Sequence, residues 1–295
     1  MYPIVNVKTR DNLILHGMLF ESSDKNAIIL HTHGTASNFY EEEFMTHLSE
    51  KLPIQSFSFL SFNNRGSGVL NHSWQERGSA VELFEECLVD LDAWIEYAKK
   101  RGYKKIILQG HSLGCEKVVY YMNKGKYRKK IAALILLGFA DSYGIQQAYL
   151  QNFGLHDQLF QEAQSLVNQG KGHQFLTSHW NAHAGILQKS AQSFLNHFSP
   201  NSELSKTLPL RDNSTLKFYR TINIPILALI SDKETAKKIN NDASEWTVIP
   251  VKDACALLKK ENKNTECSII KNTDHDFLGK ENELTKKIIS FLQRI

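Results

Sequence analysis

Short, strand-like apolar runs alternate with helix-like segments through the first half of this chain. The runs cover 27–30, 57–60, 106–108 and 131–137. Strands that are buried on both faces are apolar without alternation, and such strands are typical of a parallel sheet covered by helices on both sides. The chain is therefore predicted to have an α/β fold with a mostly parallel sheet. Ahead of these runs, residues 4–8 and 13–20 are strand-like with turn residues between them, which predicts an antiparallel hairpin.

The segments between the runs carry helix signals. One helix is expected to begin at Ser37 or Asn38, both of which are good N-cap residues, and to end near Pro53. Apolar residues recur at helical spacing from 79 to 100, and 113–122 is also expected to be helical.

The regular alternation stops after residue 140. Residues 141–215 contain helical stretches but no run typical of a buried strand. Strand-like and helix-like segments return at 224–230, 266–271 and 281–293. We therefore expect a core formed by 1–140 and 216–295, with 141–215 inserted between two late strands as a helical lid. Such a lid would cover the carboxyl ends of the strands, where open α/β sheets bind their ligands.

Composition excludes several classes of protein. The net charge is only +4, and the densest basic run, 123–130, has no aromatic stacking set, so nucleic-acid binding is not expected. No run of about 18 apolar residues occurs, and the first residues lack the pattern of a secretory signal. The cysteines Cys87, Cys115, Cys255 and Cys267 are widely spaced, which favours reduced thiols over a disulfide framework. These features predict a cytoplasmic protein without a membrane span.

The pentapeptide GHSLG at 110–114 lies between an expected buried strand and an expected helix. In this context the pattern G-x-S-x-G predicts a nucleophile elbow, in which small neighbours let the backbone bend sharply and leave the serine hydroxyl exposed. The helix that follows also points its positive N-terminal end at the site. We therefore interpret Ser112 as a nucleophile rather than as a serine in a structural turn.

A serine hydroxyl needs a general base, and the base needs an acid that orients it. The chain has twelve histidines, of which His275 lies in the loop between the last expected strand and the last helix. In the chain order Ser…acid…His, the acid should come directly after the expected strand at 224–230. Glu234 is the preferred candidate there and Asp232 the runner-up, and Asp141, just past an earlier strand, is a third. For the oxyanion hole, the backbone N–H groups of Leu113 and Thr35 are the candidates.

Five segments carry the motif residues of this chain. They are HTHGT at 31–35, NNRGSG at 63–68, GHSLGC at 110–115, SDKE at 231–234 and TDHDF at 273–277. Together they resemble the α/β-hydrolase superfamily over almost the whole chain. The stretches GHSLGCEKVVYYM and 199–212 are similar to a poorly characterised family of serine hydrolases, a fungal branch of which cleaves siderophore esters. The sequence departs from the common superfamily pattern at Ser231, where glycine is usual, and at Glu234, where aspartate is usual.

The resemblance implies an α/β-hydrolase fold and a serine hydrolase that cleaves carboxylic esters or thioesters of a small-molecule acyl substrate. The lid would set substrate choice, and no metal or organic cofactor is expected. Two alternatives stay open: an acyltransferase or cyclase with the same triad, and a non-catalytic ligand-binding protein on the same scaffold. The histidines at 179 and 183 have the spacing of a zinc-binding helix but lack its glutamate, so we interpret them as lid residues.

Overall fold

The computed structural model describes residues 3–70, 77–177, 188–211, 216–234 and 248–295. Within them lies one eight-stranded sheet with the strand order β1-β2-β4-β3-β5-β6-β7-β8. The strands are β1 (Ile4–Lys8), β2 (Ile14–Phe20), β3 (Ala27–Thr32), β4 (Phe57–Phe62), β5 (Lys105–His111), β6 (Ile131–Leu137), β7 (Ile226–Ser231) and β8 (Thr265–Ile270). The pairs β1–β2 and β2–β4 are antiparallel and the others parallel, which confirms the predicted fold class.

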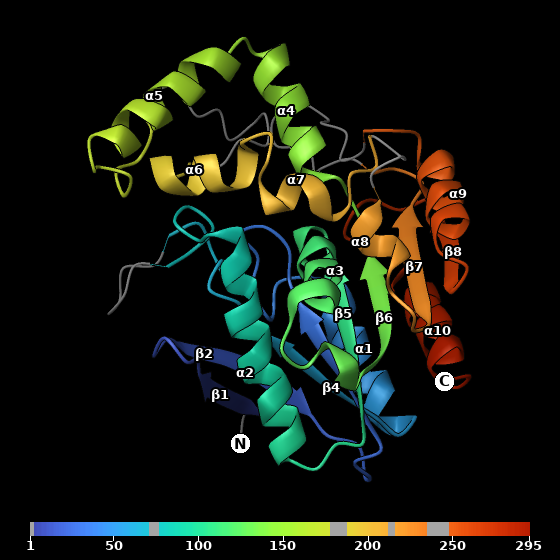
Figure 1. The fold of residues 1–295 in the computed structure, drawn as a ribbon. Coiled ribbons are helices and arrows are strands. Elements are labelled where there is room, and N and C mark those ends of the chain that lie inside the picture. The colour runs from blue at the N-terminus through green and yellow to red at the C-terminus, as the bar shows by residue number, and fades with distance from the viewer. Residues whose placement is uncertain (1–2, 71–76, 178–187, 212–215, 235–247) are drawn as a thin grey trace.

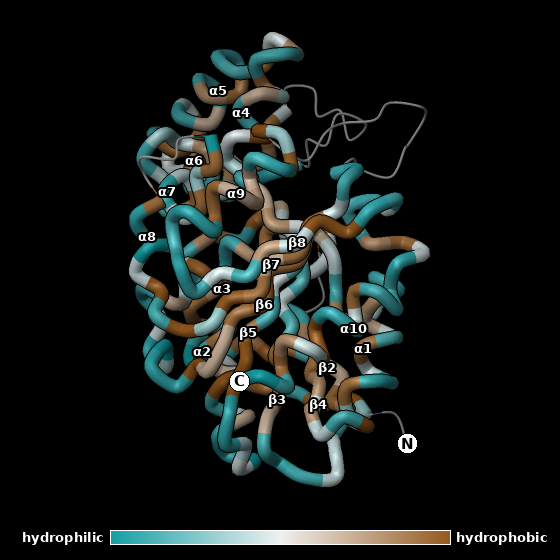
Figure 2. Tube along the Cα trace, turned by 90° about the vertical axis from the view of Figure 1, so that its right-hand side faces the viewer, coloured by the Kyte–Doolittle hydropathy of each residue, from teal (hydrophilic) through white to brown (hydrophobic). Residues whose placement is uncertain are grey.

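Helices cover both faces of the sheet (Figure 1). The helices α1 (Glu43–Ile54) and α10 (Glu281–Leu292) lie on one face, and α2 (Cys87–Lys100), α3 (Leu113–Lys124) and α9 (Val251–Glu261) lie on the other, as Figure 2 shows. Successive residues of β3 point to opposite faces, so that Ile28 packs with α2 and α3 while Ile29 packs with α1 and α10. Because both faces are buried, the strand is apolar without alternation.

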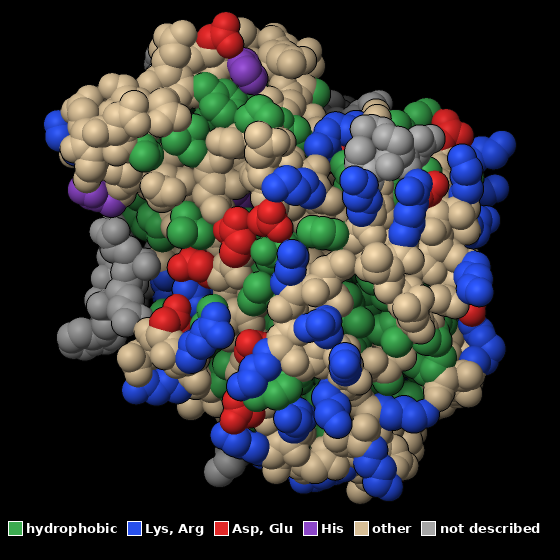
Figure 3. Space-filling model, viewed as in Figure 1, with side chains coloured by type: hydrophobic (Ala, Val, Ile, Leu, Met, Phe, Trp, Pro, Cys, Tyr) green, Lys and Arg blue, Asp and Glu red, His purple; other side chains and the backbone are tan. Residues whose placement is uncertain are grey.

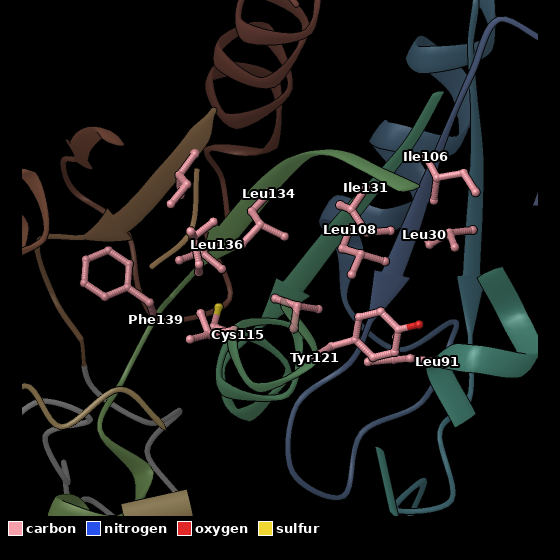
Figure 4. Close-up of a cluster of buried hydrophobic side chains, with 14 of the residues drawn as sticks. Leu30, Leu91, Ile106, Leu108, Cys115, Tyr121, Ile131, Leu134, Leu136 and Phe139 are labelled. Carbon is pink, nitrogen blue, oxygen red and sulfur yellow. The ribbon is translucent and has the colours of Figure 1, made fainter. Parts of the chain in front are cut away.

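The larger of the two cores lies between the sheet and α3. Leucines of three parallel strands, Leu30, Leu108 and Leu136, project from the sheet onto this side. Figure 4 shows them opposite Cys115 and Tyr121 of α3. All five side chains are fully or almost fully buried, and this packing fixes α3, and with it the turn that precedes it, against the sheet.

Among the described residues between β6 and β7 there are five helices. They are α4 (Ser142–Asn152), α5 (His156–Asn168), α6 (Ala191–Phe198), α7 (Glu203–Thr207) and α8 (Lys217–Arg220). Figure 1 shows α4 to α7 above the carboxyl ends of the parallel strands. A third apolar cluster joins them to the core, in which Phe194 of α6 and Leu204 of α7 share buried neighbours with Leu113 at the start of α3. The histidines at 179 and 183 lie outside the described residues.

Two helix predictions need correction. Helix α1 begins at Glu43 rather than at Ser37 or Asn38, because the Ser37 hydroxyl donates to the Glu42 carboxylate instead of capping a helix. The second is α9, for which the sequence pattern led to no predicted range. It is amphipathic, with only four buried positions among charged ones, and it follows Pro250 directly.

The prediction of four reduced cysteines is also wrong. The structure joins Cys255 of α9 to Cys267 of β8 in a disulfide, with their Cα atoms 5.6 Å apart, whereas Cys87 and Cys115 are free and buried. The pairing could not be anticipated once α9 was missed, because only this helix brings Cys255 against the neighbouring strand. None of the helices within the described ranges is both long and apolar enough to cross a bilayer.

Candidate active site

Ser112 occupies a strained turn between β5 and α3. Its backbone has φ 54° and ψ −127°, in a region that residues with a side chain rarely adopt. The two flanking glycines have no room for a side chain: a Cβ on Gly110 would overlap the carbonyl group of Gly114, and a Cβ on Gly114 would overlap the carbonyl oxygen of Thr32. The turn therefore requires glycine at positions 110 and 114, which explains the pattern G-x-S-x-G.

The loop after β3 lies directly against the Ser112 side chain. A Cβ built on Gly34 would lie 2.8 Å from Ser112 Cβ and 3.4 Å from Ser112 Oγ. The N–H of Ser112 donates to the carbonyl oxygen of Leu137 across 3.0 Å, which ties the turn to the end of β6. The backbone segments that carry the two candidate oxyanion donors, Leu113 and Thr35, therefore meet at Ser112.

A buried histidine holds the loop that carries Thr35. The Nδ1–H of His33 donates to the carbonyl oxygen of Gly34 across 2.8 Å, and His33 Nε2 accepts from the N–H of Asn64 at 3.2 Å. Burial, together with the nearby Lys117 ammonium, lowers the pKa of His33 to about 3, so the ring stays neutral and can both donate and accept. Thr35 itself is exposed, whereas Leu113 is buried.

His275 and Glu234 form a buried pair at the same edge of the sheet. His275 lies in the loop between β8 and α10, and Glu234 follows the end of β7. The distance from His275 Nδ1 to Glu234 Oε2 is 2.5 Å. Burial lowers the pKa of His275, but the Glu234 carboxylate outweighs it, with support from the aspartates on either side, so that the pKa is raised. For Glu234 burial acts in the opposite direction and raises the pKa. The nearby His275 outweighs burial, so the pKa of Glu234 is lowered and the carboxyl remains ionised.

His275 lies against Gly138 and against His111, the residue before Ser112. A Cβ on Gly138 would lie 3.0 Å from His275 Cε1 and 3.3 Å from His111 Nε2. The rings of His111 and His275 lie against each other at an interplanar angle of 39°, with their centroids 4.9 Å apart. Because His111 directly precedes Ser112 in the chain, these contacts place the histidine and its glutamate near the turn that carries Ser112.

The other two acid candidates have different partners. The Asp232 side chain is exposed and accepts from the N–H of Thr273 across 3.4 Å. Asp141 is buried, caps the N-terminus of α4 by accepting from the N–H of Gly144, and forms an ion pair with Arg211. The geometry therefore brings Glu234, and not Asp141, into contact with His275. The polar run at 235–246 that follows Glu234 in the sequence lies outside the described residues.

Two residues at this site were not singled out from the sequence. His111 occupies the variable position of the pentapeptide, and burial, followed by the nearby His275, lowers its pKa to about 4. Glu42, at the start of α1, has Oε1 3.9 Å from His111 Nδ1, and burial raises its pKa to about 7. An ionisable residue inside the pentapeptide was the only signal for His111, and nothing in the sequence marks Glu42 as buried.

A cavity of about 530 Å³ lies elsewhere on the molecule. It opens between the loop at 77–86 and the inserted helices, and its described lining includes Arg77, Glu82 and His173 but neither Ser112 nor His275. We therefore do not assign it to the reacting group. Among the described residues, no three His, Cys, Asp or Glu side chains are placed to hold a metal ion.

Comparisons with known proteins agree with this architecture. Residues 59–293 match a family described as a protein of unknown function, DUF1749. No curated protein matches the chain by sequence.

Among solved structures, the Pyrococcus furiosus esterase Pf2001 is similar, with 18% identity, a TM-score of 0.60, and coverage of 100% of this chain and 91% of the esterase. Est1E from Butyrivibrio proteoclasticus, with ferulic acid bound, has 16% identity, a TM-score of 0.64 and 98% coverage of both chains. The α/β hydrolase GrgF from Penicillium sp. sh18 has 16% identity, a TM-score of 0.65, and coverage of 99% and 97%. At these identities the likeness establishes the α/β-hydrolase fold.

Proposed function

The chain belongs to the family of unknown function DUF1749, and we propose that it is a serine hydrolase that cleaves carboxylic ester or thioester bonds through an acyl-enzyme on Ser112. The observation that carries the proposal is the convergence of the Glu234–His275 pair on the elbow. A serine at positive φ, an imidazole and a buried carboxylate are the three groups that activate a hydroxyl for attack on an acyl carbon.

In the proposed reaction Ser112 Oγ attacks the acyl carbonyl while His275 Nε2 takes the hydroxyl proton. Glu234 holds the proton on Nδ1, which leaves Nε2 as the basic nitrogen, and it stabilises the imidazolium that forms. His275 then protonates the departing alcohol or thiol. In the second half of the reaction His275 activates water, which attacks the acyl-enzyme and releases the acid.

The backbone around Ser112 supports a role in charge stabilisation. The tetrahedral intermediate carries a negative oxygen, for which the N–H groups of Leu113 and Thr35 are the proposed donors. Leu113 is the first residue of α3, so the positive end of the helix also faces the developing charge. The loop that carries Thr35 is kept close to Ser112 by Gly34, where a side chain would not fit.

We assign substrate choice to the inserted segment, 141–215. Its helices α4 to α7 lie over the carboxyl ends of the strands, where Ser112 and His275 are found (Figure 1). A small-molecule acyl substrate is consistent with the ferulic acid bound to the similar Est1E.

On the face that carries α2, Lys and Arg side chains are interspersed with acidic and neutral ones (Figure 3).

Labelling by a fluorophosphonate probe tests the proposal. The wild type should gain one adduct by intact mass, Ser112→Ala should gain none, and His275→Ala should react at least about 100-fold more slowly, since general-base catalysis typically contributes 10²–10⁴-fold. His16→Ala, on an exposed position of β2, is the matched histidine control and should react like the wild type. A folded wild type that stays unlabelled would favour the non-catalytic alternative. Product analysis with added alcohols or amines then separates hydrolysis from acyl transfer.

A further inference from the structure

We propose that Ser231 is a positioning residue of this site, whose hydroxyl holds one carboxylate oxygen of Glu234 so that the other faces His275. The inference rests on the proposed function, because it gives Ser231 a role only if the Glu234–His275 pair works in catalysis. Ser231 is the residue that stands where the superfamily usually has glycine, and Glu234 stands where it usually has aspartate.

The contacts divide the two oxygens of Glu234 between two partners. Glu234 Oε1 accepts from the Ser231 N–H at 2.9 Å and from the Ser231 hydroxyl at 2.7 Å. Glu234 Oε2 lies 2.5 Å from His275 Nδ1. The side chain is therefore held at both ends of its carboxylate.

The sheet explains why the Ser231 backbone is available for this contact. Pairing between β6 and β7 ends at Leu229, where the carbonyl oxygen accepts from the N–H of Gly138. Two residues further on, the Ser231 N–H lies beyond that ladder and points to Glu234 instead. Every residue except proline offers this N–H, so the hydroxyl is what serine adds over glycine.

The length of the acid explains why an added donor matters. Glutamate has one methylene and one rotatable bond more than aspartate, so its carboxylate can adopt more positions when it is held less firmly. Glu234 is 3% exposed and Ser231 is completely buried, so water does not replace a missing donor. A serine three residues before the acid thus compensates for the longer side chain.

The test compares Ser231→Ala with the wild type in fluorophosphonate labelling and in hydrolysis of p-nitrophenyl acetate. Loss of one hydrogen bond to the buried carboxylate should lower the labelling rate and kcat by about tenfold, with KM within about twofold. Ser231→Thr keeps a hydroxyl and should recover most of the rate. Ser268→Ala, a serine on the neighbouring strand β8, is the control and should match the wild type.

A double-variant cycle separates positioning from a structural effect. If Ser231 acts through the carboxylate, Ser231→Ala/Glu234→Ala should react no more slowly than Glu234→Ala. An equal tenfold loss in both backgrounds would overturn the proposal, because the effect would then come from the strand and not from the acid. Melting temperatures confirm that each variant is folded.

The results also distinguish a failure of the proposed role of Ser231 from a failure of the proposed hydrolase function. A wild type labelled at Ser112 and a Ser231→Ala variant labelled at the same rate would overturn the role of Ser231 and leave the hydrolase standing. A wild type without any adduct would overturn both.

Discussion

His111 Nε2 donates to the backbone carbonyl oxygen of His275 across 3.1 Å, and the two rings make a tilted contact with centroids 4.9 Å apart. The residue before the nucleophile thus holds the loop that carries the general base. A carbonyl oxygen only accepts, so the proton of His111 lies on Nε2. Burial and the neighbouring His275 lower the pKa of His111 to about 4, which keeps this donor neutral at physiological pH.

Removal of this contact should slow the reaction. We expect His111→Ala to reduce fluorophosphonate labelling by about tenfold, because a hydrogen bond of roughly 1.4 kcal/mol no longer fixes the loop. His111→Phe retains a ring without the donor and should be slowed as well. Labelling rates at pH 8 measure both, and wild-type rates in both variants would show that the loop is held by other contacts.

The pH dependence of kcat/KM should report the raised pKa of His275. A general base works only when it is neutral, so activity should fall as the pH drops below that pKa, with an inflection above the ordinary value of 6.5. In Glu234→Gln burial remains but the carboxylate is gone, so the inflection should move down and the rate should fall by about 10³–10⁴-fold. A full profile from pH 5 to 9 on a p-nitrophenyl ester checks both effects. An unchanged inflection in Glu234→Gln would contradict the assignment of the acid.

Glu42 should make stability depend on pH. Burial, with support from Asp276 and Glu41, raises its pKa from 4.5 to about 7, so between these values the folded state binds a proton that the unfolded state releases. Stability therefore falls as the pH rises through this window, by about 3 kcal/mol for this group. Glu42→Gln removes the cost, and its advantage in urea unfolding should be larger at pH 8 than at pH 5. An equal advantage at both values would mean that Glu42 does not titrate there.

A buried ion pair lies beside the loop that carries Asn64. Lys117 Nζ of α3 contacts Glu82 Oε2 at 2.8 Å and Asn64 Oδ1 at 3.1 Å, with Lys117 1% and Glu82 4% exposed. Burial alone would raise the pKa of Glu82, but Lys117, with His197 and Lys189 nearby, lowers it to about 2.

Removal of one charge of the Lys117–Glu82 pair should lower the free energy of unfolding more than removal of both charges. Lys117→Met leaves the Glu82 carboxylate without its closest cation and should lower the free energy of unfolding by about 3–5 kcal/mol. The double variant Lys117→Met/Glu82→Leu removes both charges and should recover most of that loss. Urea unfolding measures both, and a double variant as unstable as the single one would contradict this reasoning.

The sheet was predictable from the sequence because its central strands are continuously apolar. The run 131–137 coincides with β6, and the runs at 27–30 and 57–60 each stop two residues before the ends of β3 and β4. Helix α9 was missed because its few apolar positions are scattered among lysines, and the disulfide was missed with it. Composition of a single segment does not reveal which strand that segment will lie against.

The order of the motifs along the chain leads to the serine, the histidine and the preferred acid as candidates, because each follows its own strand to the same edge of the sheet. The supporting contacts were not visible in that order. Whether Ser231 donates to Glu234, and whether the His111 ring contacts that of His275, depends on side-chain direction at the ends of three different strands. Such contacts follow from the assembled fold.

The strand order has a practical consequence for anyone who expresses part of this protein. The family match begins at residue 59, after β3, yet β3 lies between β4 and β5 in the middle of the sheet. A fragment cut at that boundary would lose β1, β2, β3, the Gly34 loop and the first two residues of β4, and would leave both β4 and β5 with unpaired backbone groups open to aggregation. The smallest unit worth purifying therefore starts no later than the residues that precede β3.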